Sequence, residues 1–391
     1  MKILYRGSLM KSRIYHRIVY CILFLAILPF LGCPPYRSTP DYTDTWGLAR
    51  GVDTRGYYAY VADGMDGLKI LNISNPMGPY QIGALQLDGF NSRVDVYGHL
   101  AAVTDTEGNK VYIIDVQDPF QPRLMGTYNT LDKPVNIYYV DNVLYIAERG
   151  DDPQSAQYFS GLEAVVYQYP GSPQQISAVS ISEITDVIVP NPLFFQHLYV
   201  VSDSRLTVLS SAQGNINASP LSTLNFVNTE QIQSIDFGSN NHLLILGQSL
   251  YLMDVSDPAN PSVVTSLPVA GYSEDRVVSC KNVGYSIGPW GAPFSSFRYS
   301  DTRFVYSTQR EIGWGRIDWN NPGIILESQY DIYHDSDGNV KVYDIQMVYG
   351  GHYLTLPYTR GEKFVGAVAA MDNYGLGYTR LEEIPFSQYG P

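Results

Sequence analysis

Three arginines occupy equivalent positions in three similar segments of the chain, each shortly before an apolar run. They are Arg50, Arg93 and Arg276. A guanidinium group carries five N–H donors in a planar fork, so three such groups around one opening would bind an anionic group bidentately. The acidic residues beside these arginines are Asp53, Asp95, Glu274 and Asp275. The alternative is therefore that each arginine pairs with a neighbouring acid and fixes a loop.

A second group of candidate binding residues lies in two long segments between apolar runs. The first segment contains Arg149 and Asp151, and the second contains Trp290, Phe294, Phe297, Arg298 and Tyr299, with Trp314 just after it. Exposed aromatic side chains at this density are costly in water unless they pack locally or contact a partner. Arginine and aromatic groups together suit a protein, peptide or glycan surface, and local packing of the second segment is the alternative.

The triplet Arg149-Gly150-Asp151 resembles the integrin-recognition tripeptide. It is a match of three residues in a turn-prone loop, and chance explains it better than function.

These candidates are positioned by a repeated β unit, which is clearest from Tyr58 to Pro79. Tyr58 to Ala62 is a run of β-forming residues without helical periodicity. Gly-containing turns follow it, because glycine accepts a positive φ without steric cost. Leu68 to Ile73 is a second run, which ends before prolines that cannot donate to a sheet.

The unit recurs along most of the chain. Its first run ends at Asp63, Asp105, Glu148, Asp203 and Gln248, with steps of 42, 43, 55 and 45 residues, and weaker copies begin at Val283 and Tyr353. A period of about 40–50 residues made of short strands is typical of β-propellers. We therefore predict an all-β fold, a seven-bladed β-propeller of four-stranded blades over residues 46–391, with six or eight blades as alternatives.

Each predicted blade contains strands A to D in chain order, and the repeated unit supplies strands B and C. In propellers the B–C and D–A connections share one face, and the A–B and C–D connections share the other. We predict long insertions in the B–C connections of copy three (149–160) and copy six (288–313). Both insertions and the three arginines then surround the channel mouth on one face. Loops that grow on one face of a repeat usually mark the binding face, although surface loops also lengthen at little cost.

The repeated segments resemble the LVIVD-repeat family of β-propellers. The resemblance rests on YVADGMDGLKILNISNPMGP, VTDTEGNKVYIIDVQDPFQP and LYLMDVSDPANP, which belong to copies one, two and five. Copies three and four match in part, and copies six and seven match poorly. The family is similar to bacterial and archaeal cell-surface propellers. Its motif is structural, so the resemblance implies no reaction and no catalytic residues.

Residues 1–32 resemble a lipoprotein signal peptide. A basic segment precedes the apolar run Ile18 to Leu31, whose length of about 14 residues is short for a membrane-spanning helix. The run ends in Phe30-Leu31-Gly32-Cys33, which resembles a lipobox with Cys33 as the acylated first residue of the mature chain. An ordinary signal peptide cut elsewhere is the alternative. We predict a Pro-rich tether over 33–45 and an extracytoplasmic lipoprotein, anchored at the outer membrane or cell surface.

Charge and composition limit the function classes. Without residues 1–32 the chain has 20 Lys and Arg against 38 Asp and Glu, a net charge of −18. Such a field repels nucleic acids and anionic membrane surfaces. Cys280 is the remaining cysteine, the six histidines lack metal-ligand spacing, and no nucleophile or phosphate-loop motif is present in the sequence. We predict no metal, no cofactor and membrane contact through the lipid alone.

The leading functional interpretation is a binding or scaffolding module for a protein or a glycan. The alternative is a propeller enzyme, a hydrolase or lyase, with a polar site at the channel mouth, because the fold by itself does not exclude catalysis.

Overall fold

The computed structural model describes the residues 41–43, 45, 47–74, 79–156, 158–168, 170–189, 197–226, 232–239, 241–269, 280–283, 301–307, 311–318, 321–331, 344–351, 363–370 and 376–384. The chain divides into two compact units, Met1–Ser38 and Thr39–Pro391, and the described residues all belong to the second. No helix within these ranges is long and apolar enough to cross a bilayer. The predicted signal peptide and Cys33 lie outside the described residues.

The strands of the described ranges form seven antiparallel sheets, which we number as blades in chain order. Blade one contains β2 (Gly51–Arg55), β3 (Tyr58–Ala62), β4 (Leu68–Asn72) and β5 (Tyr80–Leu85). Blade two contains β6 (Asn91–Tyr97), β7 (Leu100–Asp105), β8 (Lys110–Asp115) and β9 (Arg123–Asn129). Blade three contains β10 (Pro134–Val140), β11 (Val143–Arg149), β12 (Ser160–Val166) and β13 (Gln174–Ser180).

The next three blades keep this order, with one addition. Blade four contains β14 (Ile184–Ile188), β15 (His197–Ser202), β16 (Arg205–Ala212) and β18 (Ser222–Asn225), and the short β17 (Asn215–Ile216) also pairs with β16. Blade five contains β19 (Ser234–Ser239), β20 (His242–Leu246), β21 (Ser249–Asp254) and β22 (Ser262–Pro268). Blade six contains β23 (Cys280–Val283), β24 (Asp301–Ser307), β25 (Glu311–Asp318) and β26 (Gly323–Asp331).

Blade seven is closed by the beginning of the unit. It contains β27 (Asp344–Gly351), β28 (Lys363–Ala370) and β29 (Leu376–Ile384), and its outer strand is β1 (Asp41–Thr43). Asp41 pairs with Tyr378 and Thr43 pairs with Leu376. The predicted tether over 33–45 is therefore too long, because its last residues take the place of the D strand of blade seven. Thr45 is also buried, and its hydroxyl donates to Asp63 at 2.6 Å.

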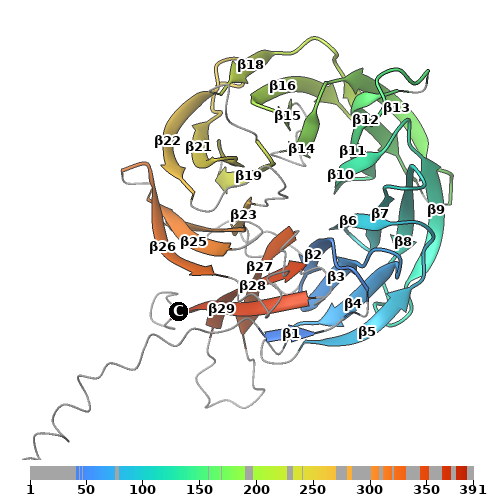
Figure 1. Ribbon diagram of the computed structural model, residues 1–391, viewed down its shortest axis with the longest axis horizontal. Coiled ribbons are helices and arrows are strands. Elements are labelled where there is room, and N and C mark those ends of the chain that lie inside the picture. Colours follow the sequence, from blue (N-terminus) through green and yellow to red (C-terminus); the bar gives the residue numbers. More distant parts are fainter. Residues whose placement is uncertain are drawn as a thin grey trace, which may run out of the picture. The chain divides into compact units, whose positions relative to one another are not determined.

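The seven blades form a closed ring within this unit (Figure 1). The innermost strand of each blade contacts that of the next in the order β2, β6, β10, β14, β19, β23 and β27, and β27 contacts β2. The cores lie between blades: Tyr60, Val94 and Val103 belong to one cluster, and Leu144 and Ile113 belong to the next. Strands B and C are therefore buried on both faces, which agrees with their continuous apolar runs.

The repeated motif has a local structural use. Strand C shifts its register against strand D at the same point in several blades, between Ile70 and Leu71, Ile113 and Ile114, and Leu252 and Met253. Such bulges increase strand twist, as a blade requires. The aspartate that ends strand C then caps the corner: Asp115 accepts the N–H of Gln117 at 2.9 Å and Asp254 accepts that of Ser256 at 2.8 Å.

The predicted seven-bladed all-β fold is confirmed, and strands B of copies one and two have the predicted bounds. Copy six was placed wrongly. Val283 belongs to strand A (β23), and strand B of this blade is β24. In copy seven, strand B is β28 rather than the segment at Tyr353, which lies outside the described residues.

This correction changes the face assigned to the copy-six insertion. The long segment after Val283 connects β23 with β24 and is an A–B connection. The segment predicted as one B–C insertion over 288–313 contains the whole of β24 and the start of β25. The copy-three insertion does connect strands B and C, because it joins β11 to β12. The two insertions therefore belong to opposite faces of the ring, and the prediction of a shared face is wrong.

Candidate functional site

A buried carboxylate lies within one residue of the end of strand B in each of the first three blades. The three residues are Asp63, Asp105 and Glu148, and their exposed fractions are 0%, 1% and 0%. Each lies at the end of the ring that carries the B–C and D–A connections, which we call the B–C face. A buried carboxylate is costly unless it is hydrogen-bonded or protonated, so the partners of each one decide its state.

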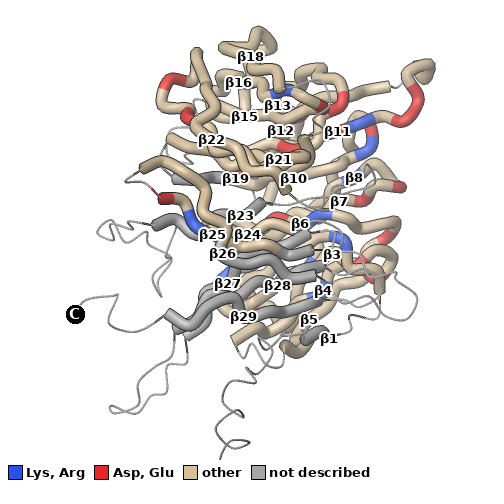
Figure 2. The backbone as a smooth tube through the Cα atoms, turned by 60° about the vertical axis from the view of Figure 1, so that its left-hand side comes forward, with Lys and Arg blue, Asp and Glu red and all other residues tan. Residues whose placement is uncertain are grey.

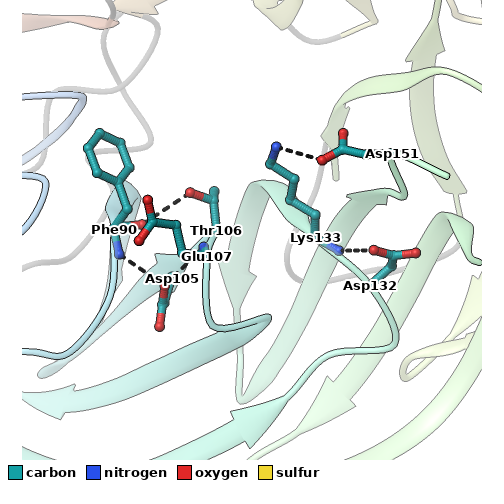
Figure 3. Close-up of polar contacts among 7 residues, drawn as sticks. All are labelled: Phe90, Asp105, Thr106, Glu107, Asp132, Lys133 and Asp151. Carbon is teal, nitrogen blue, oxygen red and sulfur yellow. Dashed lines mark hydrogen bonds and ion pairs between the residues drawn. The ribbon is translucent and has the colours of Figure 1, made fainter. Parts of the chain in front are cut away.

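In blade two the carboxylate is surrounded by donors. Asp105 accepts the N–H groups of Phe90 at 3.0 Å and Glu107 at 3.1 Å (Figure 3), and it accepts that of Gly108 at 2.8 Å. The hydroxyl of Tyr112 donates to the same carboxylate at 3.4 Å. Burial, together with the charge of Asp105, raises the pKa of Tyr112 to about 12. Asp105 thus ties strand B to the preceding D–A connection and to its own turn.

In blade three a second acid replaces the tyrosine. Glu148 lies directly opposite Gly161, and Glu163 lies opposite Ile146, so the two glutamates are diagonal neighbours on one face of the sheet. Both side chains are 0% exposed. Tyr112 pairs with Val103, which precedes Asp105 by two residues as Ile146 precedes Glu148. Glu163 therefore occupies the position that Tyr112 has in blade two.

Two donors from the preceding blade and connection reach this glutamate pair. The hydroxyl of Tyr128 on β9 donates to Glu163 Oε1 at 2.5 Å, and the N–H of Asp132 donates to Glu148 Oε2 at 2.5 Å. Burial, followed by the hydrogen bond with Glu163 and its charge, raises the pKa of Glu148 far above the usual range of a glutamate. Burial and Glu163 also raise the pKa of Tyr128, so its hydroxyl stays a donor.

Asp132 connects this pair to the copy-three insertion. Its carboxylate accepts the N–H of Lys133 at 2.8 Å and the N–H of Phe159 at 3.0 Å. The Lys133 ammonium contacts Asp151 at 3.1 Å (Figure 3). Inside the insertion, the N–H of Gly150 donates to the Phe159 carbonyl at 2.9 Å. Both ends of the insertion are thereby fixed to the connection between blades two and three.

The predicted residues of this insertion are on the surface. Arg149 ends β11 and is exposed, and its backbone N–H donates to the Lys133 carbonyl at 2.9 Å. Asp151 has a side chain that is 75% exposed. Acidic residues occupy connections in this part of the ring (Figure 2). The insertion is therefore an exposed, charged segment with a buried polar attachment.

Two of the three predicted arginines lie together at the junction of blades one and two. The Arg50 guanidinium lies 5.5 Å from the centroid of the Phe90 ring, a cation–π geometry. Arg93 Nη1 donates to the Arg50 carbonyl at 3.1 Å. Arg276 lies outside the described residues, so the proposed ring of three arginines stays a prediction.

The acids of strand A hold neighbouring blades together. Asp53 accepts the N–H of Val96 at 2.8 Å in the next blade. Asp95 accepts the N–H of Tyr139 at 2.5 Å in the same way. Asp186 repeats the contact with blade five, where it accepts the N–H of Ile235 at 3.0 Å, and it also accepts the amide of Asn136 at 2.6 Å. These side chains have a structural use that the sequence pattern did not indicate.

The aromatic candidates have different outcomes. Trp290, Phe294, Phe297, Arg298 and Tyr299 lie outside the described residues. Trp314 is in the middle of β25, with 6% of its surface exposed, so it is a core residue rather than an exposed binding residue. It follows the insertion in sequence, but it is on strand C, where the apolar side chains pack between blades. In the described part of the chain, no group of three or more His, Cys, Asp or Glu could hold a metal ion.

Glu163, Asp132 and Tyr128 were not predicted. The sequence did contain a signal for one of them, because Glu163 interrupts the apolar run Leu162 to Val166. A charged residue inside a strand that is buried on both faces needs a special partner.

The sequence comparisons identify the repeat. The LVIVD repeat model matches residues 46–85, 88–130 and 240–268. These segments cover blade one, blade two and strands B to D of blade five. Among curated proteins, none matches the sequence.

The comparisons with solved structures support the fold alone, because all sequence identities are low. Sqt1 of Saccharomyces cerevisiae has a TM-score of 0.57 at 11% identity, over 87% of this chain and 98% of that one. A functionally unknown protein of Desulfotomaculum acetoxidans has a TM-score of 0.58 at 8% identity, over 84% and 99%. The WD40 β-propeller domain of Doa1 has a TM-score of 0.56 at 10% identity, over 91% and 100%.

Proposed function

We propose that this β-propeller, which carries LVIVD repeats, is a non-enzymatic binding or scaffolding module that binds a protein or glycan partner on its B–C face. The observation that carries the proposal is the copy-three insertion. Its residues Asp151 to Ala156 are exposed, while Asp132 fixes its base through Phe159. A loop that is already fixed loses less entropy on binding, so more of the contact energy contributes to affinity.

The hydrogen bonds of the strand A aspartates favour a scaffold over an enzyme with a site in the central channel. Asp53, Asp95 and Asp186 each accept a backbone N–H from a following blade. A carboxylate that holds two blades together is constrained in position and in charge, which suits a rigid scaffold better than a general acid or base. The propeller enzyme with a site at the channel mouth is thus the weaker alternative.

We also propose that the protein is anchored outside the cytoplasm through a lipid on Cys33. The support is the basic segment, the short apolar run and the Leu31-Gly32-Cys33 sequence. Cys33→Ser is expected to abolish labelling by a radioactive fatty acid and to release the protein into the soluble fraction. Unchanged labelling in this variant would reject the lipid anchor.

The binding proposal is tested by shortening the copy-three insertion. Residues 151–158 are replaced by an Asn-Gly turn between Gly150 and Phe159, whose backbone hydrogen bond closes the base of the loop. Partners that cross-link to the intact protein on the cell envelope are expected to be lost.

The matched control is Phe120→Ser in the C–D corner of blade two, which is on the opposite face and 61% exposed. This variant is expected to retain every partner. A shortened protein that keeps its β-sheet circular dichroism and still recovers all partners would show that the insertion is not the binding segment.

A further inference from the structure

We propose that Glu148 and Glu163 share one proton, and that this proton holds the copy-three insertion on the junction of blades two and three, so that the insertion opens as the pH rises. The proposal concerns a conformational device, and it needs no ligand. It rests on the position of the two carboxyls, on their unsatisfied oxygens and on the contacts that lead from them to the insertion.

The two carboxyls lack the donors that two carboxylates would need. Glu148 Oε1 and Glu163 Oε2 are buried, and neither has a hydrogen-bond partner among the described residues. The two side chains are diagonal neighbours on the same face of β11 and β12. Two like charges at this separation in a buried site are strongly unfavourable, whereas one protonated carboxyl donates to the other and satisfies both oxygens.

Among the described residues, the titratable groups that hydrogen-bond to the pair are Tyr128 from β9 and Asp132 from the connection between β9 and β10, and neither brings a positive charge. The backbone N–H of Asp132 lowers the pKa of Glu148 and the charge of Asp132 raises it by less, so burial and Glu163 are what keep this pKa high. Lys133 directs its ammonium to Asp151 instead. The proton is therefore retained because each neighbouring charge disfavours a second carboxylate.

The pair is connected to the insertion through one residue. Asp132 donates its N–H to Glu148 and accepts the N–H of Phe159. When the shared proton is lost, the two carboxylates repel each other, and the charge of Asp132 also acts on Glu148. The least costly response is for the connection and the insertion to move away and admit water, since buried charges are hydrated when a local opening allows it.

The direction of the pH effect follows from linkage. The folded state raises the pKa of Glu148, so it binds more protons than the open state between the pKa of an exposed glutamate, about 4.3, and the raised value. The closed form is therefore fully stabilised at low pH and loses this stabilisation as the pH rises through the folded-state pKa.

The test is amide hydrogen exchange of the full chain between pH 6 and pH 10, corrected for the intrinsic exchange rate. The amides of Gly150 and Phe159, which hold the insertion closed, are expected to lose protection about tenfold per pH unit across the range in which the closed form keeps the shared proton and the open form does not. The amide of Gly108, which donates to Asp105 in blade two, serves as the internal reference and is expected to keep its protection.

Two variants make the outcome decisive. In Glu163→Gln the carboxamide donates to the Glu148 carboxylate in place of the shared proton, so the protection of Gly150 and Phe159 is expected to become independent of pH. Glu148→Gln is the second route to the same singly charged pair if the first variant fails to fold. The exposed Glu107→Gln is expected to behave like the wild type.

The proposal is overturned if wild-type protection at Gly150 and Phe159 does not change with pH. It is also overturned if protection in both glutamine variants changes with pH as much as it does in the wild type. The measurement uses no partner, so neither result bears on the proposed binding face. That proposal is decided by the experiment that shortens the copy-three insertion.

Discussion

Blades two and three bury a carboxylate at the same place and satisfy it by different means. Asp105 in blade two receives three backbone N–H groups and the Tyr112 hydroxyl. Glu148 in blade three receives one N–H and faces Glu163. In blade two the carboxylate has a full set of donors, whereas in blade three the two buried acids need a shared proton. The same repeat position is therefore held by backbone donors in one blade and by a second acid in the next.

The comparison suggests why the insertion belongs to blade three. In blade two, Asp105 binds its own turn through Glu107 and Gly108, so the B–C connection there is short and closed. In blade three this task passes to Asp132, which binds Phe159 at the far end of a longer loop. A B–C connection can lengthen when its fixing point comes from the preceding blade rather than from the turn itself.

The largest expected effect is the loss of the blade-two carboxylate. Asp105→Ala leaves the N–H groups of Phe90, Glu107 and Gly108 without their acceptor, and each lost hydrogen bond costs about 0.5–1.5 kcal/mol. We expect the free energy of unfolding in urea to fall by about 3 kcal/mol or more. A loss below about 1 kcal/mol would mean that water replaces the carboxylate and that the two blades differ less than proposed.

The second prediction concerns the backbone that approaches Asp105. Gly89 has a φ of +71°, and a Cβ at this position would overlap the Asp105 carboxylate. Gly89→Ala is therefore expected to cost about 2 kcal/mol from strain and overpacking. Leu131 precedes Asp132 as Gly89 precedes Phe90, but it is 42% exposed. Leu131→Ala should stay within about 0.5 kcal/mol of the wild type, measured by the same urea titration.

The third prediction compares the two tyrosines that donate to these acids. Tyr128→Phe removes a donor from a fully buried carboxyl pair, and we expect a loss of about 1.5 kcal/mol. Tyr112→Phe removes longer contacts, at 3.2 Å to the Asp88 carbonyl and 3.4 Å to Asp105, and should cost about 0.5 kcal/mol. Equal losses in the two variants would contradict the view that blade three depends more on its side-chain donor.

The smallest effect is expected from Glu163→Gln, and its size changes with pH. Near pH 5 the shared proton is present in the wild type, so the variant should differ little. At pH 9 the wild type has lost part of the stabilisation that the raised pKa of Glu148 provides, and the variant should be more stable by about 1 kcal/mol. Thermal unfolding at the two pH values measures this difference, and a variant that is less stable at both would remove the case for a shared proton.

Much of the scaffold could be predicted because its signals are local. In blades one, two and five, the strand bounds follow from β-forming runs between glycine and proline turns, such as Tyr58 to Ala62. Copy six failed because Val283 begins an apolar run in the sequence that resembles a strand B, whereas in the structure Val283 is the last residue of strand A (β23). The actual strand B, β24, starts after a long segment and has no such turn signal.

The outer strand of blade seven and the acid pair were beyond such local reasoning. β1 is three residues long and lies in a Pro-rich segment, so only its pairing with β29 reveals it. Glu148 could be assigned to the end of a strand, but its partner Glu163 is identified by the register of β11 and β12. The contact of Tyr128 with Glu163 depends on how neighbouring blades pack, which no sequence period specifies.

The pairing of β1 with β29 has a kinetic consequence. It joins Asp41 to Tyr378, two residues at opposite ends of the folded unit, and contacts of such long sequence separation form late because loop closure must be completed first. During synthesis the first blade emerges while the partner of β1 is still unmade, so the ring stays open with unpaired strand edges until the end of the chain appears. Unpaired edges of this kind are where partly folded chains associate. The period between the making of blade one and the making of β29 is thus when the nascent protein is most exposed to aggregation and has most need of a chaperone.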